Sequence, residues 1–194
     1  MKICIFGASS AFIDSIYIEQ VEALAEKMAR RGHSLVFGAG ATGVMGAAAR
    51  GTKAGGGHIH GVIPEFFREE RVEKIYTECD VLTYTPDMAT RKTLMEDDCD
   101  AFIIAPGGIG TFEEFFEVIT LKQLGRHDKA IAMFNIEGYF DTLEKFMQEM
   151  AQKKFLSEGC LHMYKYFTDA DELLDYLEGY SPSNEPWQAL KHGE

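Results

Sequence analysis

The sequence has few cysteines, and the four that occur are scattered. They stand at Cys4, Cys79, Cys99 and Cys160, without a Cys-x-x-C pair and without a histidine cluster beside them. Structural zinc sites need closely spaced pairs of ligands, so no metal site is expected. Cys4 falls in an apolar segment, where a buried free thiol is the ordinary interpretation.

Positive charge is also scarce. The chain has 19 lysine and arginine residues against 31 aspartate and glutamate residues, which gives a formal net charge of -12. This balance argues against a protein that coats nucleic acid or an anionic membrane. It still allows a small anionic ligand, because the backbone N–H groups of one loop can bind phosphate against an unfavourable overall field.

Long apolar runs are missing as well. No stretch reaches the roughly 18 apolar residues that suggest a membrane-spanning helix. Residues 1–7 lead directly into a strand and a turn, without a signal-peptide pattern. We therefore expect a soluble, cytoplasmic protein with no membrane partner and no nucleic-acid partner.

Repeats, linkers and low-complexity segments are absent, and 194 residues with 46% hydrophobic content suit one sizeable domain. Short apolar runs alternate with segments of helical periodicity, which indicates βαβ units. We predict an α/β fold: a single Rossmann-like domain over residues 1–180, doubly wound, with a mostly parallel sheet and helices on both faces. Residues 181–194 carry two prolines without periodicity and are predicted to form a loose tail.

The individual elements follow from the same patterns. The expected strands are Lys2–Phe6, Ser34–Phe37, Ile59–Ile63, Lys74–Leu82, Ala101–Ala105 and Ala130–Phe134. The expected helices are Ile16–Arg31, Val44–Ala54, Asp87–Asp97, a long helix that runs through Leu124, Phe140–Lys153 and Ala170–Leu177.

Three loops at the carboxyl ends of these strands are rich in glycine or serine, at residues 7–10, 38–43 and 106–111. Ligands of open parallel sheets bind beyond these strand ends. The third loop, Pro-Gly-Gly-Ile-Gly-Thr, joins an apolar strand to a helix and is typical of a phosphate site. Its glycines allow a close backbone approach, and the helix N-terminus offers free N–H groups and a positive dipole end. Thr111 can cap this helix or donate its hydroxyl to a phosphate oxygen.

The second loop, Gly38–Gly43, formally matches the dinucleotide pattern G-x-G-x-x-G. A lone match is weak, and the acidic residue expected about 20 residues later is absent. His58, His60 and Gly61 stand there instead. Two interpretations stay open for this loop: a nucleotide-binding turn, or a tight turn that packing requires. The third loop is not a Walker A motif, since no Gly-Lys-Ser/Thr follows it.

Two carboxylates, Glu113 and Glu114, stand in the first turn of the helix after the third loop. Acidic residues are structurally ordinary at a helix N-terminus. Beside a phosphate site, however, they are also well placed to stabilise a cationic sugar transition state. The spacing of the apolar residues predicts a core stripe that excludes both glutamates and consists of Phe112, Phe115, Phe116 and Ile119.

A cationic pair, Arg91 and Lys92, lies early in the preceding helix. Such a pair is a solvated helix face in most proteins, and a contact to an anionic ligand is the alternative. The sequence pattern alone leaves both interpretations open.

Residues 106–114 have the form PGGxGTxxE, which resembles the signature of the LOG (Lonely guy) family. Its members are cytokinin riboside 5'-monophosphate phosphoribohydrolases that are often labelled lysine decarboxylases. The resemblance runs from about residue 3 to residue 177. Residues 38–46 resemble the family's GGGxxGLMG loop, residues 88–92 its MHxRK motif, and residues 123–129 its QLGxHxKP segment.

The chain departs from the family pattern in several places. Ala89 replaces the histidine of MHxRK, Ala39 replaces the middle glycine of the triplet, Gly7-Ala8 replaces Cys-Gly, and Ala130 stands where a proline is common. The arginine and the glutamate that the family uses for catalysis are both kept. The departure at Ala89 therefore bears on the contacts to base or ribose, and so on the substrate, more than on the reaction.

The resemblance implies hydrolysis of the N-glycosidic bond of a purine or N6-modified adenine nucleoside 5'-monophosphate, as in an AMP nucleosidase. Glu114 would be the catalytic carboxylate, with Glu113 as the near alternative, and Arg91 would orient the nucleotide or stabilise charge on the leaving base. No metal or organic cofactor is needed, and a homodimer is expected. The nucleotide would be bound by Gly107, Gly108, Gly110 and Thr111 at the phosphate, by Lys92 and Met88 nearby, and by Ser9, Ser10, Gly40 and Gly43 on the purine side.

Two other functions compete with this one. Molybdenum-cofactor carrier proteins share the fold and a PGGxGT loop, so a binding protein without catalysis stays an alternative. The presence of both Arg91 and Glu114 favours the enzyme, because a carrier does not need a carboxylate beside the sugar. A lysine decarboxylase needs pyridoxal phosphate, a Schiff-base lysine and an acidic partner for the ring nitrogen. No lysine lies at a strand-end loop with such companions, so this activity is not expected.

Overall fold

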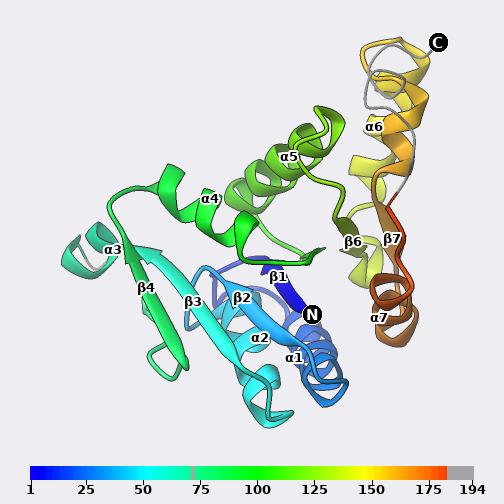
Figure 1. The fold of residues 1–194 in the computed structure, drawn as a ribbon. Coiled ribbons are helices and arrows are strands. Elements are labelled where there is room, and N and C mark those ends of the chain that lie inside the picture. The colour runs from blue at the N-terminus through cyan, green and yellow to red at the C-terminus, as the bar shows by residue number, and fades with distance from the viewer. Residues whose placement is uncertain (71–72, 183–194) are drawn as a thin grey trace.

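The computed structural model describes residues 1–70 and 73–182, and they form the predicted α/β architecture (Figure 1). Seven strands make one sheet in the order β4-β3-β2-β1-β5-β6-β7. Every neighbouring pair is parallel, so the mostly parallel sheet that we predicted is parallel throughout. The strands are β1 Lys2–Phe6, β2 Ser34–Phe37, β3 Ile59–Pro64, β4 Val81–Thr85, β5 Ala101–Ile104, β6 Ala130–Phe134 and β7 Lys165–Phe167.

Helices cover both faces of this sheet, as a doubly wound fold requires (Figure 1). The apolar residues of α1, α2 and α7 pack in one core layer, and those of α4, α5 and α6 pack in a second layer on the other face. The helices are α1 Ser15–Arg30, α2 Gly43–Ala54, α3 Glu65–Glu70, α4 Met88–Asp97, α5 Ile109–Gln123, α6 Asp141–Gln152 and α7 Ala170–Glu178, with short 3-10 turns at Ile136–Gly138 and Glu158–His162.

The central strands are apolar along their whole length because both of their faces are buried. In β1, Ile3 and Ile5 belong to the layer of α1 and α2, whereas Cys4 and Phe6 belong to the layer of α4 and α5. All four side chains are at most 2% exposed. This two-sided burial is why continuous apolar runs, rather than alternating ones, predicted the strands correctly.

Helices α1 and α2 pack very closely because α2 consists mainly of small residues. A Cβ atom placed on Gly51 would lie 2.1 Å from the backbone oxygen of Glu22, so no larger residue fits this contact. The close packing holds α2 against α1, and α2 begins directly after the loop that joins it to β2.

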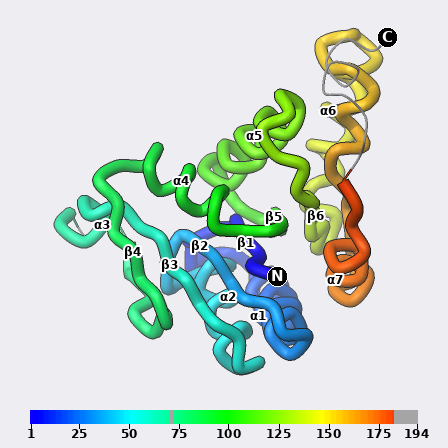
Figure 2. The backbone as a smooth tube through the Cα atoms, viewed as in Figure 1, coloured from blue at the N-terminus to red at the C-terminus, as the bar shows by residue number. Residues whose placement is uncertain are grey.

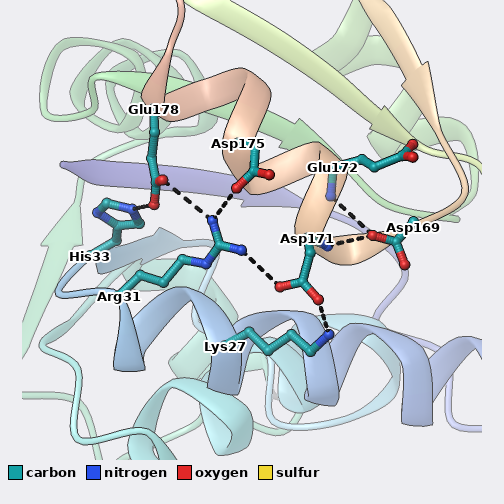
Figure 3. Close-up of polar contacts among 8 residues, drawn as sticks. All are labelled: Lys27, Arg31, His33, Asp169, Asp171, Glu172, Asp175 and Glu178. Carbon is teal, nitrogen blue, oxygen red and sulfur yellow. Dashed lines mark hydrogen bonds and ion pairs between the residues drawn. The ribbon is translucent and has the colours of Figure 1, made fainter.

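A network of ion pairs joins α7 to the end of α1. Arg31, directly after α1, donates to Asp171 at 2.8 Å and to Asp175 at 2.6 Å. Because these side chains are partly exposed, each pair contributes little to stability by itself. The network connects the last described helix to the N-terminal half of the sheet, and its members are Lys27, Arg31 and His33 on one side and Asp171, Asp175 and Glu178 on the other (Figure 3).

One predicted strand, Lys74–Leu82, is wrong in its extent. The strand is Val81–Thr85, which pairs with β3 along its whole length. Residues 74–80 are irregular: Ile75 forms an isolated bridge with Gly40 in the loop after β2, and Asp80 N donates to the Ile59 oxygen at the start of β3. Residues 74–80 therefore do not pair along a neighbouring strand in the way that β4 pairs with β3.

Two short elements were not predicted. Helix α3 has no buried residue, so it lacks the apolar stripe on which a helix prediction depends. Strand β7 has three residues, which is too short for a recognisable pattern. Of the predicted tail, Ser181 and Pro182 are irregular, and residues 183–194 lie outside the described residues. None of the helices described is long and apolar enough to cross a membrane.

Candidate functional site

A cavity of about 330 Å³ opens at the carboxyl ends of the central strands. Its walls come from the loop after β1, from the first turns of α4 and α5, and from the region of α3. This is the edge of a parallel sheet at which ligands bind. The predicted site residues that line it are Ser9, Ser10, Met88, Arg91, Gly108, Gly110, Thr111, Glu113 and Glu114.

The glycine turn before α5 presents free backbone groups to this cavity. Gly108 is the N-cap of α5, and no described side chain caps the helix, so the capping role considered for Thr111 is not used. The first N–H groups of a helix have no acceptor within the helix. Together with the positive end of the helix dipole, they form an anion site at the start of α5.

The three glycines of this turn have different roles. Gly107 is buried and does not line the cavity, and a Cβ atom there would lie 2.1 Å from Thr111 Oγ1 and 2.9 Å from the Ala8 nitrogen. Gly108 and Gly110 line the cavity, and no described atom would lie within 4 Å of a Cβ at either position. Gly107 thus shapes the turn, whereas Gly108 and Gly110 leave space for a ligand.

An ion pair of Arg91 and Glu114 lies in the cavity wall. Arg91 Nη1 donates to Glu114 Oε1 at 3.3 Å, and the two side chains are 8% and 10% exposed. Arg91 Nε also donates to the Val62 oxygen at 3.2 Å, which fixes the guanidinium against the end of β3. A Cβ atom on Gly38 would lie 1.9 Å from Arg91 Nη2, so this glycine of the second loop makes room for the arginine.

The Glu114 carboxyl group is tuned for proton transfer near neutral pH. Burial raises its pKa to about 7, although the positive charge of Arg91 opposes this shift. A carboxyl group with such a pKa can give up and take back a proton at physiological pH. Glu114 also lies one turn after the anion site, in the wall of the same cavity.

Glu113 and Lys92 form an ion pair at the rim of the cavity. Lys92 Nζ pairs with Glu113 Oε1 and, at 2.6 Å, with Glu117 Oε2. The Glu113 side chain is 51% exposed, and Lys92 does not line the cavity. Of the two candidate carboxylates, Glu114 therefore has the buried position beside the arginine.

The helical stripe predicted for α5 is partly wrong. Phe115 and Ile119 are buried as expected, but Phe116 is 38% exposed, and Glu114 is buried instead of lying on the solvent side. The reason is that one face of α5 packs on the core, whereas another face, which carries Glu114, is covered by the walls of the cavity. In the described part of the chain, no group of three or more His, Cys, Asp or Glu side chains is arranged to hold a metal ion.

Known proteins resemble this chain over most of its length. The family model described as "Possible lysine decarboxylase" matches residues 45–177. Cytokinin riboside 5'-monophosphate phosphoribohydrolase LOG1 of Arabidopsis thaliana is 36% identical over 195 residues, which cover 100% of this chain and 90% of LOG1. LOG4 of the same plant is 37% identical, with 95% of this chain and 85% of LOG4 covered. The chain belongs to the LOG family.

Solved structures support the fold. The molybdenum cofactor carrier protein of Chlamydomonas reinhardtii has a TM-score of 0.70 with 19% identity, over 91% of this chain and 95% of the carrier. The molybdenum cofactor binding protein of Rippkaea orientalis has a TM-score of 0.64 with 15% identity, over 91% and 93% of the two chains. At this level of identity the likeness establishes the Rossmann-like fold alone.

The second glycine loop packs against the cavity without lining it. Gly43 has a φ of 60°, and a Cβ atom there would lie 2.5 Å from the Ser10 oxygen. Gly40 is buried against the Met45 side chain. Ala39 has a φ of 59°, a left-handed backbone conformation that glycine adopts more readily than alanine. These contacts are the ones that a tight packing turn requires, and nucleotide binding by Gly40 and Gly43 stays a prediction.

Five residues of the cavity wall were not among the predicted site residues: Gly7 and Ala8, which lie in the predicted loop at residues 7–10, and Met45, Phe67 and Glu73. Met45 lies within the LOG-family loop at residues 38–46, so the resemblance could have indicated it. Phe67 and Glu73 carry no local signal, because tertiary packing of α3 and the chain after it brings them to the cavity.

Proposed function

We propose that this LOG-family protein hydrolyses the N-glycosidic bond of a purine nucleoside 5'-monophosphate, giving free base and ribose 5-phosphate. The observation that carries the proposal is the buried Arg91–Glu114 pair in the same cavity as the uncapped N-terminus of α5. The names of LOG1 and LOG4 describe phosphoribohydrolases of cytokinin riboside 5'-monophosphates, which is the same class of reaction. We include AMP among the substrates, as for an AMP nucleosidase.

The phosphate of the substrate binds at the start of α5. Free N–H groups of the turn and the Thr111 hydroxyl donate hydrogen bonds to its oxygens, and the helix dipole favours its negative charge. The ribose then lies next to Glu114. This placement brings the anomeric carbon C1' and the bond to the base within reach of the buried carboxylate.

Hydrolysis requires one bond to break and one to form at C1'. As the C1'–N9 bond breaks, its electron pair leaves with the base and the sugar acquires oxocarbenium character, which the Glu114 carboxylate stabilises. A water molecule attacks C1' and transfers a proton to Glu114, and this proton is then available to the departing base. The Arg91 guanidinium stabilises negative charge that develops on the base or orients the nucleotide.

The label "possible lysine decarboxylase" does not describe this cavity. None of its described lining residues is a lysine, and the nearby Lys92 is paired with Glu113 and Glu117. The residues that are present, a carboxylate and an arginine beside an anion site, suit glycosidic bond hydrolysis.

The activity is tested by incubating the protein with AMP and with isopentenyladenosine monophosphate, and measuring free base and ribose 5-phosphate by chromatography. We expect stoichiometric release of both products from at least one nucleotide. Binding of the nucleotides without any release would contradict the hydrolase and support a carrier of the same fold.

Replacement of Gly108 by alanine tests the phosphate site. The new methyl group meets no described atom, so the fold should persist, but it enters the space of the phosphate. We expect KM for AMP to rise by about tenfold or more, which corresponds to the loss of one or two charge-assisted hydrogen bonds. Steady-state kinetics and thermal unfolding measure the two effects.

Gly107→Ala is the matched control for this variant. Its methyl group would overlap Thr111 Oγ1, so it should lower the melting temperature clearly, in contrast to Gly108→Ala. A Gly108→Ala protein with unchanged KM would place the phosphate elsewhere.

We further propose that the protein is a cytoplasmic homodimer. Apolar side chains on α5, Ile109 at 90%, Phe116 at 38% and Leu124, just after the helix, at 38% exposure, support a contact with a second copy. The thiols at Cys4, Cys79 and Cys99 suit a reducing compartment. Sedimentation velocity of the wild type and of Phe116→Glu would show whether this surface holds a dimer together.

A further inference from the structure

Glu73 adds a third carboxylate to the wall of the cavity, on a different loop from Glu113 and Glu114. It follows α3, which leaves the end of β3, whereas the glycine turn leaves the end of β5. Strands β2 and β1 lie between β3 and β5 in the sheet. The chain trace accordingly shows α3 and α5 on opposite sides of α4 (Figure 2). Glu73 and the glycine turn therefore reach the cavity from different strand ends, and a nucleotide with its phosphate at α5 and its base directed toward Glu73 would bridge them.

The contacts of Glu73 leave acceptor capacity for a ligand. The Ser9 hydroxyl donates to its carboxylate, and the positive charge of Arg91 also acts on it. Burial raises the pKa of Glu73 above the usual range for a glutamate, against both of these contacts. A carboxylate has about four lone-pair positions, so the bond from Ser9 leaves others that can accept an N–H or O–H of a ligand.

A second hollow adjoins the cavity at Glu73. It has a volume of about 470 Å³ and is lined by Phe67, Arg68, Glu73, Lys74, Ile75 and Thr77. Phe67 and Glu73 line both spaces and so stand at their junction. An aromatic ring beside a hydrogen-bond acceptor suits the face and the polar edge of a purine.

We propose that Glu73 selects 6-amino purine nucleotides over 6-oxo purine nucleotides by accepting a hydrogen bond from the exocyclic amine. The inference rests on the proposed function for the direction in which the nucleotide lies. A 6-oxo purine presents an oxygen acceptor at this position, so the lone pairs of that oxygen and of the carboxylate repel each other. The nearest donor of a 6-oxo purine, N1–H, lies at the next ring position and does not replace the exocyclic amine without a shift of the base. An N6-substituted adenine keeps one N–H, and its substituent points into the second hollow.

Binding measurements without turnover test this selection. Calorimetry with Glu114→Gln protein would compare AMP, IMP and 2'-deoxy-AMP, before and after the additional change Glu73→Gln. We expect AMP to bind at least about tenfold more tightly than IMP, and the second change to reduce this ratio to within about threefold. The ratio of AMP to 2'-deoxy-AMP should stay the same. Glu70→Gln, on the exposed side of α3, is the matched control and should leave both ratios unchanged.

Different results separate this inference from the hydrolase proposal. An AMP to IMP ratio that does not depend on Glu73 overturns the inference, and so does a Glu73 effect confined to 2'-deoxy-AMP, which would assign the residue to the ribose. If Glu73-dependent selection is found but the wild type releases no base, the inference stands and the hydrolase proposal fails. If no nucleotide binds at all, both are overturned.

Discussion

Glu114→Gln should lower kcat for base release by about a thousandfold, a loss typical of removing a carboxylate that acts as general base and stabilises developing charge. Glutamine keeps the volume of the side chain and can still accept from Arg91, but it can neither take a proton from water nor carry negative charge. The phosphate site at the start of α5 is untouched, so KM for AMP should change little. Initial rates of ribose 5-phosphate release measure both constants.

Glu113→Gln is the matched control, because the two glutamates are neighbours with opposite surroundings. Glu113 is half exposed and paired with Lys92 at the rim, so its loss should change kcat by no more than about threefold, as for an exposed ion pair. The reverse result, a large loss for Glu113→Gln and a small one for Glu114→Gln, would assign the chemistry to Glu113.

The pH dependence of the wild type follows from the same carboxyl group. Burial holds the pKa of Glu114 at about 7, so the group is protonated, and unable to act as a base, at lower pH. We expect kcat/KM to rise as the pH increases through about 7. In Glu114→Gln protein, the residual activity should lack this rise. A rise of the same size and midpoint in the variant would show that another group titrates.

Much of the fold was predictable because its central strands are buried on both sides. Such strands must be apolar throughout, and small residues must follow them where the chain turns at the edge of the sheet. The prediction failed for segments in which buried apolar residues do not recur at the spacing of a helix or strand. Helix α3 has no buried residue, and in residues 74–80 a single bridge replaces the pairing that apolar residues predicted.

The site was predictable as far as it is local in the sequence. The glycine turn and Glu114 follow one another in the chain, and the LOG-family resemblance added Arg91 from the preceding helix. Periodicity could not show that Glu114 is buried, because the spacing of apolar residues indicates only the helix face that packs on the core. A polar residue that is buried by the walls of a cavity leaves no such pattern. Nor could periodicity show that Gly38 leaves space for the Arg91 guanidinium, because that contact joins segments more than 50 residues apart in the sequence.

Arg91→Ala should lower kcat/KM by about a hundredfold or more, the loss expected for a preorganised charge in a water-poor site. The variant removes the cation that stabilises charge on the substrate and leaves the Glu114 carboxyl without its partner. Because the Arg91 charge opposes the upward shift of the Glu114 pKa, that pKa should rise further when the arginine is lost. The pH at which activity is half-maximal should therefore move above about 7.

This shift separates a role at the reacting groups from a structural one. Arg91→Lys keeps the positive charge but not the paired donors, so it should keep the pH midpoint near that of the wild type while kcat/KM stays low. Lys92→Ala, at the next position but outside the cavity lining, should keep the rate and shift the midpoint less than Arg91→Ala does, because the Lys92 charge contributes less to the Glu114 pKa. Thermal unfolding shows whether each variant is folded under the conditions of the assay. An Arg91→Ala protein with full activity and an unmoved midpoint would remove the arginine from the mechanism and leave Glu114 to act without it.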